Sequence, residues 1–263
     1  MTVQEAIDRI VARVPGTPRA NSVDTLKTGR GDAAVTGIVT TFMATVPVLR
    51  RAAALGANLV ITHEPTFYNH LDQTDWLAAD PVHQAKRRLI DEHGIAVFRF
   101  HDYWHQHRPD GILYGVLRDL GWKQYATPGD PRVLDLPAAP LADLAVAMKE
   151  RLGITNPVRI VGDPRLVCRR VGILVGAWGG RPQISLLSQR PDLDVLIVGE
   201  AAEWETPEYV RDAAALGRRV ALLVLGHAAS EEAGMKYLAE WLADVLPGVL
   251  ATHVPAGDPF VSV

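Results

Sequence analysis

Short apolar runs alternate with helical segments along the whole chain, and this alternation is the feature that most restricts its fold. The apolar runs that we predict to be strands are residues 34–41, 58–62, 95–100, 171–175, 194–198 and 220–225. Helices are predicted between them, most evidently at 182–189 and 207–216. Strands that alternate with helices favour a mainly parallel sheet with both faces covered. The sequence therefore predicts an α/β fold of two similar lobes with mixed, mainly parallel sheets.

A stretch rich in proline separates the two halves of this pattern. Residues 127–140 contain several prolines and a glycine, which makes this stretch the best candidate boundary between two lobes. We therefore expect a first α/β lobe at 1–127 and a second at 128–263. A last helix is predicted with Ser230 as its N-cap, because serine at that position binds free backbone N–H groups.

The counts of cysteine and histidine restrict the chemistry that the chain can support. Nine histidines stand beside a single cysteine, Cys168, in 263 residues. One cysteine excludes an intrachain disulfide and a cysteine-rich zinc site. Any metal would therefore be held by nitrogen and oxygen ligands, and we expect Cys168, just before a strand, to be a core residue.

Charge and hydropathy exclude two further classes of protein. The 27 basic and 30 acidic residues give a net charge of -3, which argues against a nucleic-acid binder. The run Lys86, Arg87 and Arg88 is the basic cluster that would favour one, and we interpret it as a solvated helix face. No apolar run approaches the roughly 18 residues that span a membrane, and the N-terminus does not resemble a signal peptide. A cytoplasmic protein is expected.

Histidines and carboxylates follow three predicted strands, 58–62, 95–100 and 220–225, at their carboxyl ends. In open α/β sheets, ligands bind in the crevice beyond these ends. Imidazole suits zinc, iron, nickel or copper, whereas carboxylate suits harder ions such as manganese. The residues at this shared position are His63, Glu64, His101, Asp102, His105, His227 and Glu231. All except Asp102 are our candidate metal ligands, for one metal or for two that share an acidic bridge.

Each of these residues also has an ordinary structural interpretation. A single histidine is more often a core or surface residue than a ligand. Glu231 could serve only as a charge in the first turn of a helix, and Glu64, which precedes Pro65, only as a loop residue. The joint pattern favours a metal site because all three groups lie at strand ends.

Several segments of the chain resemble the Nif-three-like family, whose members are often described as GTP cyclohydrolase I type 2 homologues. The resembling segments are 57–65, His101 with His105, 158–163, 194–200 and 226–231. The resemblance implies two α/β lobes, a dinuclear centre of divalent metal ions and assembly as a toroidal hexamer. It also implies that His63, His101, His227 and Glu231 are ligands, the last two completing the site from the second lobe.

Two positions depart from the family pattern. Glu64 stands where the family usually has a second histidine, and His105 stands where it usually has an aspartate. The departures compensate each other, because the set still contains four histidines and two carboxylates. Our hypothesis is that Glu64 or Glu231 bridges two metals while His105 binds one of them. A site with only one metal is the alternative.

The predicted function is that of a metal-dependent hydrolase acting on a small molecule, with Glu64 or Asp102 as the candidate catalytic residue that orients water. Ring opening of GTP is the specific activity that the resemblance implies. The alternative is a metal-binding ring or interaction scaffold without turnover. The sequence leaves the metal open among zinc, iron, manganese and nickel.

Overall fold

The computed structural model describes residues 1–261 and divides into two compact units. Unit 1 consists of Met1–Gly115 and Gly234–Ala256, and unit 2 consists of Val116–Ala233 and the residues from Gly257 onward. The chain returns to unit 1 near its end because the strand β11 (Ala251–His253) pairs with β2 (Ile38–Thr41). Residues 127 and 128, where we expected the lobes to meet, lie inside unit 2.

Unit 1 contains a five-stranded sheet in the order β1–β4–β3–β2–β11, with β1 at Leu26–Thr28, β3 at Leu59–Thr62 and β4 at Ala96–Arg99. All its pairings are parallel except that of β1 with β4. The register places Thr41 opposite Thr62 and Thr62 opposite Arg99. The chain therefore leaves β2, β3 and β4 at one common edge. Residues 34–37 of the first predicted strand lie outside this sheet, and Ala34 forms an isolated bridge with Thr2 instead.

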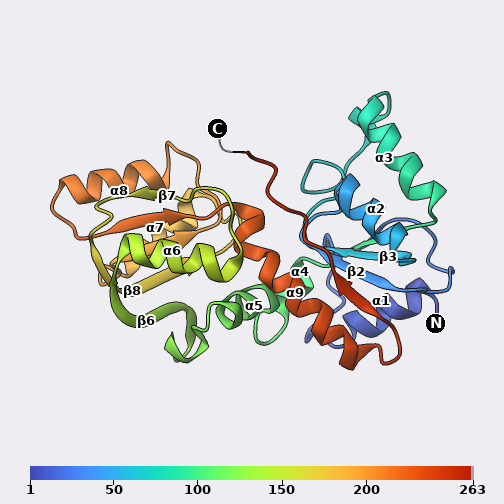
Figure 1. Ribbon diagram of the computed structural model, residues 1–263, viewed down its shortest axis with the longest axis horizontal. Helices are drawn as coiled ribbons and strands as arrows, with labels where there is room; N and C mark the ends of the chain where they lie inside the picture. Colours follow the sequence, from blue (N-terminus) through green and yellow to red (C-terminus); the bar gives the residue numbers. More distant parts are fainter. Residues whose placement is uncertain (262–263) are drawn as a thin grey trace. The chain divides into compact units, whose positions relative to one another are not determined.

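Helices cover both faces of this sheet (Figure 1). The helices of unit 1 are α1 (Val3–Val11), α2 (Val46–Ala54), the 3-10 helix η1 (Asp75–Leu77), α3 (Pro81–Glu92) and α4 (Asp102–Gln106). Val39, Val60 and Val97 point from the strands into one apolar core with α2 and α3. On the opposite face, the Thr40 hydroxyl donates to the carbonyl of Met235, 2.8 Å away, in α9 (His227–Val245). Two helices, α5 (Gly111–Asp119) and α9, run through the points where the units divide.

Unit 2 contains a six-stranded sheet in the order β5–β6–β8–β9–β10–β7. Its strands are β5 (Ala126–Thr127), β6 (Asp130–Pro140), β7 (Arg159–Val161), β8 (Val167–Leu174), β9 (Val195–Val198) and β10 (Ala221–Val224). The central pairings of β9 with β8 and β10 are parallel, and the outer three are antiparallel. The prediction of an α/β fold with mixed sheets is therefore confirmed, with unit 1 the more parallel of the two.

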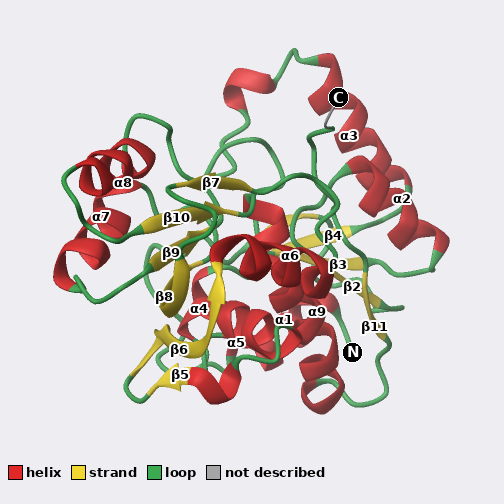
Figure 2. Cartoon of the chain, turned by 60° about the vertical axis from the view of Figure 1, so that its left-hand side comes forward, coloured by secondary structure: helices red, strands yellow, loops and turns green. Residues whose placement is uncertain are grey.

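The helices of unit 2 are the 3-10 helix η2 (Lys123–Tyr125), α6 (Leu141–Leu152), α7 (Gly180–Gln189) and α8 (Thr206–Ala215). Figure 2 shows α7 and α8 together beside β8, β9 and β10. Leu187 of α7 and Val210 of α8 share an apolar core with Leu196 and Leu222 of the strands. Cys168 is fully buried in β8, as expected, and burial raises the pKa of its thiol to about 12. Among residues 1–261, no helix combines the length and apolar character that crossing a membrane requires.

Two local predictions are wrong. Residues 130–140, within the stretch expected to be the boundary, form the strand β6. Pro137, which has no N–H to donate, lies where the pairing of β6 with β8 is irregular, between Asp135 and Ala139. Ser230 is not an N-cap, because α9 begins at His227. The Ser230 hydroxyl instead accepts the N–H of Gly176 at 2.9 Å, so tertiary contacts within unit 2 determine its position.

Lys86 also differs from its prediction, since it is buried rather than solvated. Its ammonium donates to the carbonyl of Thr66 at 2.6 Å and lies 5.6 Å from the centre of the Phe67 ring and 5.3 Å from that of Tyr68. Burial lowers the pKa of Lys86 from 10.5 to about 8. The basic run thus has one member that anchors the loop after β3.

We predict that Lys86→Met removes a rise in stability at alkaline pH. Between about pH 8 and pH 10.5 the unfolded chain holds a proton on Lys86 that the folded chain has released, so stability increases with pH there. The pKa difference corresponds to about 3 kcal/mol across this range. Urea unfolding of wild type and variant between pH 7 and 10.5 measures it. The exposed Arg88→Met is the control on the same helix, and parallel profiles for wild type and Lys86→Met would contradict the prediction.

Candidate metal centre

Backbone hydrogen bonds fix the two segments that carry the candidate ligands of unit 1. After β3, the N–H groups of His63 and Glu64 both donate to the carbonyl of Phe42, at 3.2 and 2.8 Å. After β4, the N–H of His101 donates to Asp24 at 2.9 Å. The ligand-bearing residues are therefore held by the ends of neighbouring strands rather than by a free loop.

Three imidazole rings meet at this edge of the sheet. The ring centre of His63 lies 4.6 Å from that of His101 and 5.0 Å from that of His105, and the latter two are 5.1 Å apart. One nitrogen from each ring lies within 4.8 Å of the others. His101 and His105 face one another because the single turn of α4 separates them by four residues, as their spacing predicted. These three residues form the candidate metal group of unit 1.

The Nδ1 atom of each ring contacts a protein oxygen. Nδ1 of His101 lies 3.0 Å from Asp102, Nδ1 of His105 lies 3.0 Å from Asp110, and Nδ1 of His63 lies 3.4 Å from the carbonyl of Phe100. Oxygens of this kind accept an N–H, so they favour the tautomer with the proton on Nδ1. This is the arrangement found around metal-ligating histidines, in which the outer contact orients the ring and leaves Nε2 to the metal.

Glu64 lies beside this group and is paired with a buried cation. Its Oε1 is 3.8 Å from Nε2 of His101, and its Oε2 is 3.4 Å from Nη2 of Arg99. The Arg99 side chain has no solvent exposure, and it also donates to the carbonyls of His63, at 3.1 Å, and His70. The guanidinium therefore compensates the Glu64 charge and fixes the backbone on both sides of it.

Two aspartates support the turn that carries His101 and His105. Asp24 accepts the N–H groups of His101, Asp102 and Tyr103 at the start of α4. Burial raises the pKa of Asp24, although these hydrogen bonds oppose the rise. Burial would raise the pKa of Asp102 too, but hydrogen bonds from His101, Ser22 and the backbone of Val23 hold it below its usual value. Asp102 is therefore suited to remaining an anion that orients His101.

In unit 2, His227 stands between two carboxylates at the start of α9. Its Nδ1 lies 3.0 Å from Glu200 and its Nε2 lies 3.1 Å from Glu231. Glu231 is nearly fully buried, and a Cβ atom on Gly176 would collide with its carboxylate. Glycine at 176, which has a φ of 78°, is thus what leaves room for the Glu231 side chain. The structure brings the predicted pair His227 and Glu231 together within this unit.

Four residues of these clusters were absent from the predicted set: Asp24, Arg99, Asp110 and Glu200. Two of them could have been identified from the sequence. Arg99 is a charged residue inside an apolar strand, and Glu200 follows a strand at its carboxyl end. Asp24 and Asp110 could not, since their roles depend on where the chain places α4. Their contacts are visible only in the folded structure.

We predict that Arg99 and Glu64 are energetically coupled in the metal-free protein. Arg99→Met removes the charge that compensates Glu64, and breaking a buried pair in this way costs about 3 kcal/mol. In a double variant that also carries Glu64→Gln, the loss in free energy of unfolding should be smaller than the sum of the losses in the two single variants, by at least about 1 kcal/mol. Urea unfolding in the presence of a chelator measures all four free energies.

The exposed pair Arg30 and Asp32, whose side-chain atoms are 2.7 Å apart, is the matched control. The same cycle with Arg30→Met and Asp32→Asn should give no measurable coupling, because water screens the pair. Equal coupling in the two cycles would show that burial of Arg99 does not matter.

Comparison with known proteins adds the following findings. Solved structures with the same fold include protein SA1388 of Staphylococcus aureus, at 20% sequence identity and a TM-score of 0.77, with 100% of this chain and 99% of that chain covered. TTHA1606 of Thermus thermophilus has 17% identity and a TM-score of 0.68 over 99% and 100% of the two chains. Reduced HcgD of Methanocaldococcus jannaschii has 15% identity and a TM-score of 0.65 over 96% and 97%.

A search of the curated proteins finds no match. The model of the Duf34/NIF3 (NGG1p interacting factor 3) family matches residues 1–255, which is nearly the whole chain. This match confirms the resemblance noted in the sequence, and the chain belongs to the Duf34/NIF3 family.

Proposed function

We propose that this protein binds divalent metal ions, two per chain, and that it is a metal-dependent hydrolase. The observation that carries the proposal is the group of His63, His101 and His105, whose ring nitrogens converge while each Nδ1 contacts a protein oxygen. The proposed ligands are His63, Glu64, His101, His105, His227 and Glu231.

The donor set fits a borderline divalent ion. Four imidazoles and two carboxylates suit zinc, iron, manganese or nickel better than a hard ion such as calcium. Glu64 has Arg99 at Oε2, so we propose that it binds through Oε1. Glu64 and Glu231 would supply the carboxylate ligands of the proposed set.

Metal ions held by these residues would supply Lewis acidity for attack of water on a carbonyl or phosphoryl group. The residues themselves have definable roles. Asp102 holds the His101 ring through its Nδ1, and Asp110 does the same for His105. Glu64 and Asp102 are the two candidates to orient the attacking water, as the sequence predicts. Hydrolysis is the proposed reaction class, and GTP is one substrate to test.

A second candidate function is a metal-binding ring or scaffold without turnover. The observation that favours it is that both candidate catalytic carboxylates are occupied, Glu64 by Arg99 and Asp102 by His101, Ser22 and Val23. A carboxylate so engaged is a weaker base for water. In either case we propose a cytoplasmic homo-oligomer, a toroidal hexamer as the family resemblance implies.

We predict that metal content depends on the proposed ligands. Wild-type protein should contain two divalent ions per chain and elute at six times the chain mass. His101→Ala and His227→Ala should each lower metal affinity at least tenfold, because each removes a ligand. Elemental analysis with light scattering measures both properties, and the exposed His93→Ala is the control. A monomer with substoichiometric metal that neither variant lowers further would contradict the proposal.

Turnover separates the two candidate functions. Metal-loaded wild type and the double variant His63→Ala/His227→Ala would be compared on phosphoesters, nucleotides including GTP, and small amides. The hydrolase proposal predicts metal-dependent product with wild type that the double variant does not form. Full metal loading without turnover in any class would favour the scaffold.

A further inference from the structure

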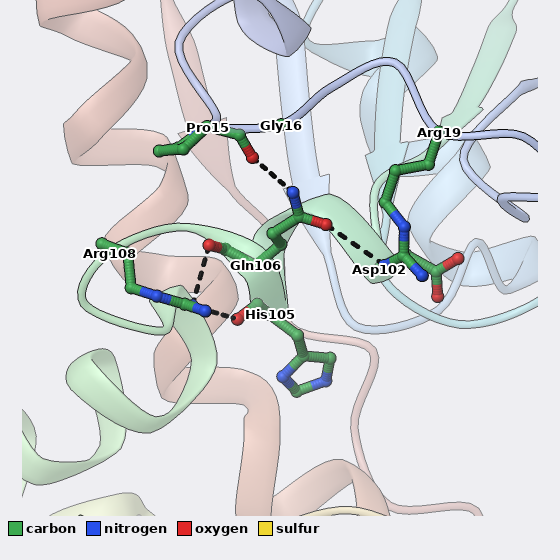
Figure 3. Close-up of a pocket in the computed structure, with 7 residues that line it drawn as sticks. All are labelled: Pro15, Gly16, Arg19, Asp102, His105, Gln106 and Arg108. Atoms are coloured by element: carbon green, nitrogen blue, oxygen red, sulfur yellow. Dashed lines mark hydrogen bonds between the residues drawn. The ribbon is translucent and has the colours of Figure 1, made fainter.

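A cleft of about 550 Å³ lies in unit 1, and Figure 3 shows the residues that line it. His105 and Asp102 line it, so one ligand candidate and the residue that orients another form part of its wall. The other polar side chains on the wall belong to Arg19, Gln106 and Arg108. A molecule in this cleft would lie beside His105 and near the guanidinium groups of Arg19 and Arg108.

Arg108 is held in place at the end of α4. Its Nη1 donates to the carbonyls of Gln106 at 2.8 Å, His107 at 3.1 Å and His105 at 3.4 Å. This contact satisfies the last carbonyls of the helix. Among residues 1–261 no protein acceptor contacts Nε or Nη2 of Arg108, so these donors are available to a ligand.

Arg19 is held from the other side of Gln106. Its Nη1 donates to the Gln106 amide oxygen at 3.1 Å, and its backbone N–H donates to the Tyr103 hydroxyl at 3.0 Å. The Gln106 amide nitrogen in turn donates to the carbonyl of Pro15. Figure 3 shows the two arginines on opposite sides of Gln106. Ordering long side chains costs conformational entropy. Because the two arginines are already ordered in the free protein, a ligand that binds them loses less affinity to this cost.

The charge of the cleft is positive. Asp102 is its one lining carboxylate within the described part of the chain, and both oxygens of Asp102 already accept hydrogen bonds, Oδ1 from His101 and Oδ2 from Ser22 and Val23. The contacts of the two guanidinium groups described above are all with neutral oxygens. Guanidinium binds phosphate and carboxylate through paired, charge-assisted hydrogen bonds.

We propose that this cleft binds the phosphate group of a phosphorylated small-molecule substrate through Arg19 and Arg108. Two cationic groups match a phosphate monoester, which carries nearly two negative charges at neutral pH, better than a monocarboxylate. That this ligand is the substrate rests on the proposed function, because the cleft shares His105 with the metal group. Binding of the phosphate group itself depends only on the arginines.

The test is a titration of chelator-treated full-length protein with inorganic phosphate, methyl phosphate and acetate. Calorimetry measures the binding of all three ligands, and phosphorus NMR measures that of the two phosphates as well. Arg19→Gln and Arg108→Gln should each weaken phosphate binding about tenfold. Arg51→Gln, on the exposed face of α2, should leave it unchanged. Arg108→Lys keeps the charge but loses the paired donors, so it should bind phosphate more weakly than wild type.

Metal content measured on untreated portions of the same protein preparations, taken before the chelator is added, keeps the two claims separate. Phosphate binding that falls in both arginine variants, with metal content unchanged, supports the proposal. Three results would overturn it. Wild-type protein could bind metal but no phosphate, or bind acetate as tightly as phosphate, or the Arg51→Gln variant could lose as much phosphate affinity as the Arg19 and Arg108 variants. Phosphate binding by a protein that holds no metal would support the anion site and contradict the metal proposal alone.

Discussion

The candidate metal centre of unit 1 depends on one buried cation. Arg99, the last residue of β4, donates to the carbonyls of His63 and His70 and lies beside the carboxylate of Glu64. A guanidinium in a fully buried position is unfavourable unless several acceptors surround it. The sheet, the loop after β3 and the acidic ligand candidate are therefore fixed together, because each supplies part of what Arg99 requires.

The same physical arrangement recurs around the histidines of both units. In unit 1 the Nδ1 atoms of His101 and His105 contact carboxylates, and in unit 2 Nδ1 of His227 contacts Glu200. Such contacts fix the ring and its tautomer, so Nε2 is presented in a defined direction. The surrounding carboxylates thus orient the rings of His101, His105 and His227, and the arrangement occurs separately in each unit.

The sequence pattern predicted that His63 lies near His101 and that His227 lies near Glu231, and both pairs are close together in the structure. His63, His101 and His227 follow apolar strands, and residues at the carboxyl ends of parallel strands share one edge of their sheet. The sequence did not predict the positions of side chains that depend on contacts with residues far away in the chain. The Ser230 hydroxyl contacts the backbone of Gly176 instead of capping a helix, and Lys86 turns inward to the carbonyl of Thr66. Asp24 likewise lies 77 positions before the N–H of His101 that it accepts.

We propose that His63, His101 and His105 bind metal through Nε2 while Nδ1 keeps its proton. Proton–nitrogen correlation NMR of histidine-labelled protein during a zinc titration tests it most directly, because it resolves both nitrogens of every ring. We expect the Nε2 resonances of these three residues to shift on zinc addition, their Nδ1 atoms to stay protonated, and the exposed His93 not to respond. Rings that continue to titrate as free imidazoles in saturating zinc would contradict it.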